Sequence, residues 1–139
     1  MRPRVNKSQA SGVKIPKTVQ WSTEQRILKY ANAHYAGKFT RLDIRFHGAL
    51  CYVDAYTEPA EPSPEFLSAM RETREEYLER LRKEPVHLCR LRYSGREDRW
   101  SMAFYTYSND KYEPCVFDTG DHHGTPEEAF ETAAMYLQD

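Results

Sequence analysis

Long apolar runs, cysteine and an excess of either charge are all scarce in this sequence of 139 residues. No stretch approaches the ~20 apolar residues of a membrane-spanning helix, and no signal-peptide core follows Met1, so we expect a cytoplasmic protein with no membrane segment. Three cysteines, an odd number, favour reduced thiols over a disulfide framework. A net charge of −1 argues against a dedicated duplex-DNA binder, since such domains are normally strongly basic.

Charge is nevertheless distributed unevenly along the chain. The first 17 residues contain five basic residues and no acid, whereas the residues from Asp118 onward contain six acids and neither lysine nor arginine. The basic segment has no apolar periodicity, and proline and glycine interrupt it, as is typical of a loosely held tail. The sequence therefore predicts a flexible basic arm over residues 1–20 and a single α+β domain over residues 21–139.

Three segments carry helix signals. The first covers residues 22–37, from a capping box that starts at Ser22 to a glycine stop. The second covers residues 63–85, from a Ser-Pro pair suited to a helix start to a terminating proline. The third begins with another capping box at Thr125 and continues with apolar residues at helical spacing to the end of the chain.

Residues 41–56 have the pattern of a β-hairpin. A two-residue turn at Gly48-Ala49 suits a glycine with positive φ. In that register Ile44 faces Val53 across the two strands, and the other face places Asp43 directly opposite Asp54. One face of this hairpin is therefore wholly apolar, and a slip of one residue would expose it.

Two more hairpins are predicted downstream, with loops at residues 94–97 and 108–111. Their registers pair Leu91 with Trp100 and Phe104 with Cys115, again with apolar residues on one side. The expected fold is a single α+β domain in the order α-β-β-α-β-β-β-α. Its five-stranded, mostly antiparallel sheet carries the helices on its apolar face.

The polar face of this sheet is expected to hold the binding site. Four arginines alternate there with four tyrosines, a combination that can hold anionic groups and stack on planar ones. An exposed face of structural cross-strand pairs is the competing interpretation. The candidate ligand-binding residues, called the Arg/Tyr face below, are Arg41, Arg45, Tyr52, Tyr56, Arg90, Arg92, Tyr105 and Tyr107.

Two groups are candidate metal ligands. Asp43 and Asp54 form a carboxylate pair, although flanking arginines favour a charge-compensated lattice in which Asp54→Asn costs about 1 kcal/mol or less. His122 and His123 lie in the loop DTGDHHGT, ahead of the third helix, where they are suited to bind an anion or a metal. All four are retained as candidate metal ligands.

The sequence thus favours a small cytoplasmic binding or regulatory protein that engages a partner through the Arg/Tyr face. No nucleophile with a matched base is visible, so catalysis is not favoured, and no cofactor is expected. A protein is the favoured partner. The first alternative is binding of a single-stranded nucleic acid or a nucleotide. The second is a metal-dependent hydrolase that uses Asp43 and Asp54 or the histidine loop. The sequence leaves the oligomeric state and the strand order open.

Overall fold

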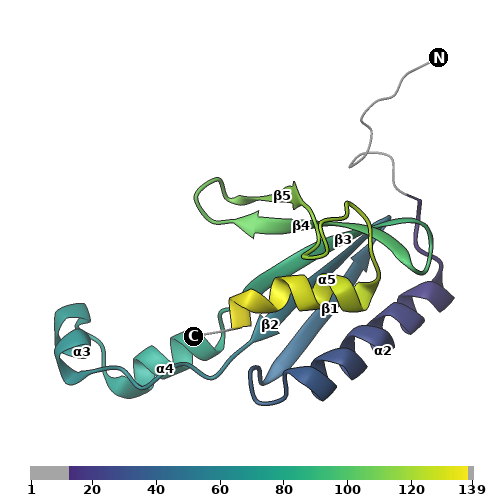
Figure 1. Ribbon diagram of the computed structural model, residues 1–139. Helices are drawn as coiled ribbons and strands as arrows, with labels where there is room; N and C mark the ends of the chain where they lie inside the picture. Colours follow the sequence, from purple (N-terminus) through teal and green to yellow (C-terminus); the bar gives the residue numbers. More distant parts are fainter. Residues whose placement is uncertain (1–12, 138–139) are drawn as a thin grey trace.

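A computed structural model describes residues 13–137 of the chain, which form one antiparallel sheet flanked by helices (Figure 1). The five strands follow each other in the sheet in chain order. They are β1 (Arg41–His47), β2 (Leu50–Tyr56), β3 (Val86–Arg96), β4 (Arg99–Thr106) and β5 (Lys111–Cys115). The helices are α2 (Lys17–His34), α3 (Pro64–Met70), α4 (Arg74–Arg82), α5 (Pro126–Ala133) and the 3-10 helix η1 (Ala134–Leu137). The predicted α+β architecture is confirmed.

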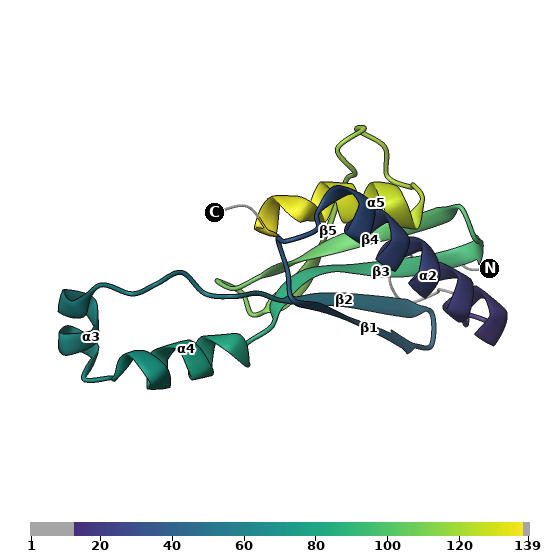
Figure 2. The same cartoon turned by 90° about the horizontal axis from the view of Figure 1, so that it is seen from below.

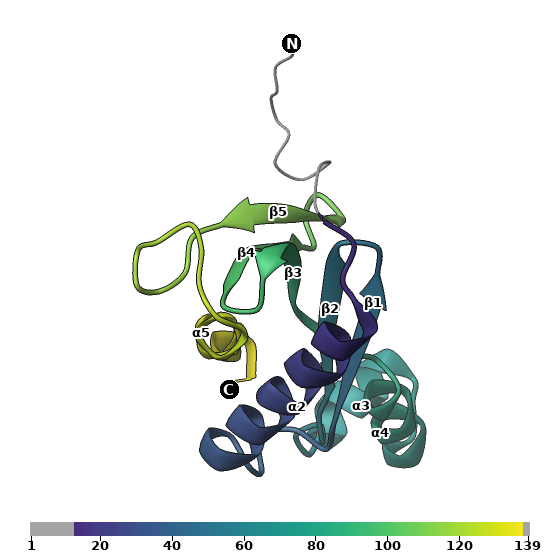
Figure 3. The ribbon, with the colours of Figure 1, turned by 90° about the vertical axis from the view of Figure 1, so that its right-hand side faces the viewer.

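Two of the helices, α2 and α5, cover the same face of the sheet (Figure 3). The core lies between them and the strands, and its largest fully buried side chains include Trp100, Phe117 and Phe130. Arg26 of α2 joins the two helices through a bidentate ion pair with Glu127 of α5, at 2.7 and 2.8 Å. Apolar burial on this face leaves the opposite face of the sheet to polar residues.

The ordered domain begins earlier in the chain than the sequence predicted. Ile15 is 1% exposed, and its N–H donates to the carbonyl of Gly48 in the β1–β2 turn. Helix α2 starts at Lys17, so Ser22 lies inside it and not at its N-cap. The predicted arm over residues 1–20 is therefore wrong for residues 15–20, because burial of Ile15 and Val19 holds them on the core. Residues 1–12 lie outside the described residues.

The predicted middle helix is interrupted. Arg71 adopts a left-handed conformation, with φ of +57°, and ends α3. Thr73 then starts α4 with a complete capping box to Glu76. Both helices extend beyond the ends of the strands and do not lie across the sheet (Figure 2).

The helices were also compared with the requirements of a membrane span. Among residues 13–137, none of them combines the length and the apolar character that crossing a membrane requires.

The strand registers are confirmed for the first hairpin and shifted for the other two. Ile44 faces Val53, and Asp43 faces Asp54, as predicted. In the second hairpin Leu91 pairs with Met102 and not with Trp100. Cys115 likewise pairs with Met102 and not with Phe104. Both shifts amount to two residues, so they move the pairs along the strand but keep each side chain on its predicted face.

The cysteines provide a test of this core. Cys51 and Cys89 are fully buried, and burial raises the pKa of both thiols well above its usual range. Cys115 is half-buried, and burial raises its pKa to about 11. We expect Cys115 to react slowly with a thiol reagent in the native protein, and the other two only after unfolding. Labelling followed by mass spectrometry measures the rates; fast native modification of Cys51 or Cys89 would show that the register is wrong.

Candidate functional site

The structure places all eight residues of the Arg/Tyr face on the side of the sheet away from α2 and α5. In the β1–β2 pairing Arg41 lies opposite Tyr56 and Arg45 opposite Tyr52, and Tyr52 in turn lies opposite Arg90 of β3. Within residues 13–137, no helix covers this side, since α3 and α4 project past the strand ends (Figures 2 and 3). Arg41, Arg45 and Tyr107 are exposed, and the other five residues of the face are half-buried.

Guanidinium groups lie over tyrosine rings across the face. The Cζ atom of Arg41 is 4.0 Å from the centre of the Tyr56 ring, and that of Arg45 is 5.4 Å from the centre of Tyr52. Arg90 lies over Tyr112, at 5.1 Å. Such cation–π contacts favour one orientation of the long side chain, and three of the four arginines of the face make them.

A buried carboxylate organises the middle of the face. Asp54 is 2% exposed, and its two oxygens have different partners. Oδ2 accepts from Arg45 at 3.0 Å, and Oδ1 lies 3.0 Å from Nδ1 of His87. Arg45 also donates to Asp43 at 2.7 Å, so one guanidinium pairs with both aspartates of the cross-strand pair. This confirms the charge-compensated arrangement that the sequence favoured for the pair.

His87 reaches the face because of a β-bulge. The register between β2 and β3 shifts between Val53 and Asp54, so that Val53 faces Cys89 whereas Asp54 faces His87. Leu88 is the additional residue, and it is buried in the core. Strict alternation along β3 would have placed His87 on the apolar side with Cys89, which is why the sequence analysis did not find it.

Around His87, aromatic rings form a cluster. The centre of the His87 ring lies 4.7 Å from that of Tyr105 and 6.1 Å from that of Tyr107. The rings of His87 and Tyr107 are nearly parallel, with an angle of 23° between their planes. Tyr112, which the sequence analysis also missed, contacts Tyr52 and Tyr105 edge-on at 5.6 and 5.1 Å. Burial, reinforced by the charge of Asp54, raises the pKa of the Tyr112 hydroxyl well above its usual range. Tyr112 thus keeps its hydroxyl proton.

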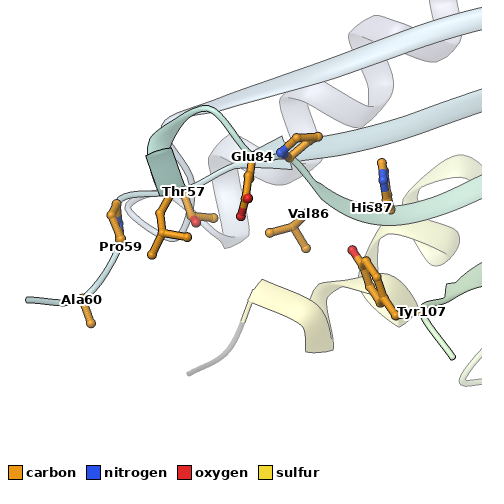
Figure 4. A pocket seen from close by; sticks show the side chains of 9 residues that line it. Thr57, Pro59, Ala60, Glu84, Val86, His87 and Tyr107 are labelled. Atoms are coloured by element: carbon orange, nitrogen blue, oxygen red, sulfur yellow. The ribbon is translucent and has the colours of Figure 1, made fainter. Parts of the chain in front are cut away.

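The cluster borders a cavity of about 630 Å³ at the end of the sheet (Figure 4). His87 and Tyr107 form one wall, and the segments that lead into α3 and out of α4 form the other. Among the described residues no serine, threonine or cysteine hydrogen-bonds to His87. The Asp54–His87 pair therefore orients an imidazole beside the cavity.

The candidate metal ligands do not meet in one site. Asp43 and Asp54 lie on β1 and β2 around Arg45, whereas His122 and His123 lie in the loop between β5 and α5, beside Arg92 and Ser101. Within residues 13–137, no group of three or more histidine, cysteine or acidic side chains is arranged to hold a metal ion.

Comparisons of the chain with protein-family models, with curated proteins and with solved structures found no match.

Proposed function

We propose that this chain is a non-catalytic binding protein that docks a protein partner on the Arg/Tyr face. The observation that carries the proposal is the absence of any helix over this face within residues 13–137, although α2 and α5 cover the other face completely enough to bury Trp100 and Phe130. A polar, aromatic sheet surface that its own chain leaves uncovered is available as an interface.

The residue types on the face match those that dominate protein interfaces. Tyrosine and arginine are enriched among the side chains that carry most of the binding energy, because they combine large contact area with hydrogen bonding. Here the arginines are already held against tyrosine rings, at 4.0 Å in the case of Arg41 and Tyr56. Ordering before association reduces the conformational entropy that binding costs.

Charge indicates the chemistry of the partner. Four arginines share the face with three aspartates: Arg45 pairs with Asp43 and Asp54, and Asp110 accepts from the Tyr105 hydroxyl. The face is therefore net positive, and an acidic protein surface complements it.

A single-stranded nucleic acid is the less favoured partner. Such ligands stack their bases on aromatic rings, but guanidinium groups already lie over Tyr52, Tyr56 and Tyr112. Tyr107 is the most exposed tyrosine of the face, at 66%, and one of its ring faces lies against His87. Few ring faces therefore remain for a strand to stack on.

Affinity capture with matched variants tests the proposal. The double variant Arg41→Glu/Tyr107→Ala alters two exposed side chains of the face, whereas Lys29→Glu makes the same charge reversal on an exposed residue of α2. We expect the tagged wild-type chain and Lys29→Glu to capture the same acidic protein from an extract of source cells. The double variant should recover at least about tenfold less of it, the loss typical of one hot-spot residue.

Titration of the same proteins with labelled single-stranded RNA and DNA completes the test. We expect weak, salt-sensitive binding that the double variant does not change, since the basic N-terminal residues alone can supply it. Strand binding that the double variant abolishes would replace the protein partner by a nucleic acid. Captured proteins that do not differ between the double variant and Lys29→Glu would contradict the proposal.

A further inference from the structure

A second cavity lies beside β4, where β5 leaves the sheet. Its volume is about 160 Å³, and it combines two regions that the sequence analysis treated separately. Arg92 and Ser101 reach it from β3 and β4, and His122 and His123 reach it from the loop before α5. Met102 and Cys115 contribute to its apolar wall.

The loop that carries the histidines is fixed next to β4. Gly124 and Trp100 exchange two backbone hydrogen bonds, at 2.8 and 2.9 Å, as an isolated bridge. A β-carbon on Gly124 would lie 2.8 Å from the buried ring of Phe117, so this close approach requires glycine. The histidines are therefore held at the cavity by backbone contacts, and the cavity is part of the folded structure.

Two residues that line this cavity each carry a buried polar atom that has no hydrogen-bond partner among the described residues. Arg92 and Ser101 face each other in the β3–β4 register. Within residues 13–137, the Nε atom of Arg92 and the Oγ atom of Ser101 are both buried and make no hydrogen bond. Buried polar groups are almost always paired, and a charged donor is the costliest to leave unpaired. Both atoms can donate a proton, so an oxygen acceptor satisfies them together.

The charge around the cavity is positive. Among the described residues Arg92 has no acidic partner, and burial together with the charge of Arg90 lowers the pKa of its guanidinium. Burial also lowers the pKa of His123, helped by the charges of Arg99 and Arg92. Arg92 and Arg99 thus place positive charge beside His123, and this charge favours an anion over a further cation at the cavity.

We propose that this cavity binds a small tetrahedral oxyanion, of the phosphate or sulfate class, between Arg92, Ser101 and the His122-His123 loop. The volume accommodates about five water molecules at their share of liquid volume, which is room for four oxygens and their central atom. A guanidinium and a hydroxyl are the donors that recognise such oxygens. The site shares Arg92 with the Arg/Tyr face, but Ser101 and the His122-His123 loop lie outside the eight residues of that face.

Titration of the full-length protein with inorganic phosphate or sulfate, followed by ¹H–¹⁵N NMR, tests the site. We expect saturable shifts at the amides of Ser101, His122 and His123, with a dissociation constant of about 1 mM or tighter. Chloride at matched ionic strength should not reproduce them. Arg92→Gln should weaken binding about tenfold or more, as loss of a charged hydrogen bond does. Lys29→Gln, which removes one positive charge from the exposed surface of α2, should leave binding unchanged.

Ser101→Ala serves as the second variant, because it removes one donor without touching the charge. We expect it to weaken phosphate binding about fivefold while the circular dichroism spectrum and thermal midpoint stay native. Tighter binding of O-phosphoserine than of inorganic phosphate would assign the site to phosphoryl groups on larger molecules, and the reverse order to the free anion. Shifts that follow ionic strength alone, or binding unchanged in both Arg92→Gln and Ser101→Ala, would overturn the proposal.

Discussion

Replacing Trp100 with alanine is expected to lower the free energy of unfolding by about 3–5 kcal/mol, the range for deleting a buried aromatic side chain. The Trp100 side chain is fully buried, and its ring centre lies 5.0 Å from that of Tyr93. Its indole N–H donates to the carbonyl of Glu97 at 2.9 Å. Alanine leaves a cavity in the core and an unpaired carbonyl, and it removes the bulk that supports the bridge to Gly124.

Urea unfolding followed by circular dichroism measures this loss, and the only other tryptophan provides a matched control. Trp21 lies on α2 with 67% of its surface exposed, so Trp21→Ala should change the free energy of unfolding by about 0.5 kcal/mol or less. If Trp100→Ala leaves too little native protein to measure, Trp100→Phe should still cost more than Trp21→Ala. Equal costs for the two tryptophans would contradict the described core.

Asp54→Ala is expected to lower the free energy of unfolding by about 2–3 kcal/mol, because it removes hydrogen bonds to two groups from a buried carboxylate. The loss should stay below the cost of breaking a fully buried ion pair, about 3–5 kcal/mol, because the two partners can return to water. The side chain of Arg45 is 46% exposed and that of His87 is 29% exposed. Because Asp54 is buried, the expected loss in free energy of unfolding exceeds the value of about 1 kcal/mol that the sequence predicted for Asp54→Asn.

Asp43 is the control, since it lies directly opposite Asp54 and shares the guanidinium of Arg45. Its side chain is 35% exposed, so Asp43→Ala should cost less than about 1 kcal/mol. Denaturant unfolding of both variants at neutral pH gives the comparison. A larger loss for Asp43→Ala than for Asp54→Ala would mean that Asp54 does not organise the face.

Local sequence signals predicted the fold correctly where a single turn, or the alternation of apolar and polar residues, determines the structure. The β1–β2 hairpin is correct to the residue, because Gly48, with φ of +61°, fixes the turn and the apolar alternation fixes the register. The later hairpins are shifted by two residues. Alternation with a period of two cannot distinguish such registers, so the faces were predicted correctly while the individual pairs were not.

The errors arise where long-range packing overrides a local signal. Ser22 has the spacing of a capping box, but α2 extends five residues further toward the N-terminus, because Ile15 and Val19 are buried against the core. In the middle segment, the sequence contains the Thr73–Glu76 capping box. The apolar pattern continues through it without interruption, so one helix was predicted where the structure has two. These two errors concern helix boundaries, and they did not affect the predicted sheet.

The candidate site was predicted in part for the same reason. The arginines and tyrosines follow strand alternation, whereas His87 reaches the face only through a bulge, which has no clear signal in a single sequence. Arg92 and the His122-His123 loop line the same cavity because Trp100 and Gly124 form a backbone bridge. Nothing in the sequence indicates that these two segments contact each other.

Hydroxyl-radical footprinting of the purified complex between this chain and its captured partner tests the central claim most directly. Tyr56 and Tyr107 lie on the Arg/Tyr face, whereas Trp21 and Tyr136 are exposed on α2 and η1, away from it. The account predicts that complex formation slows oxidation of Tyr56 and Tyr107 severalfold and leaves Trp21 and Tyr136 at their rates in the free protein. Protection of Trp21 and Tyr136 with unchanged oxidation of Tyr56 and Tyr107 would contradict it.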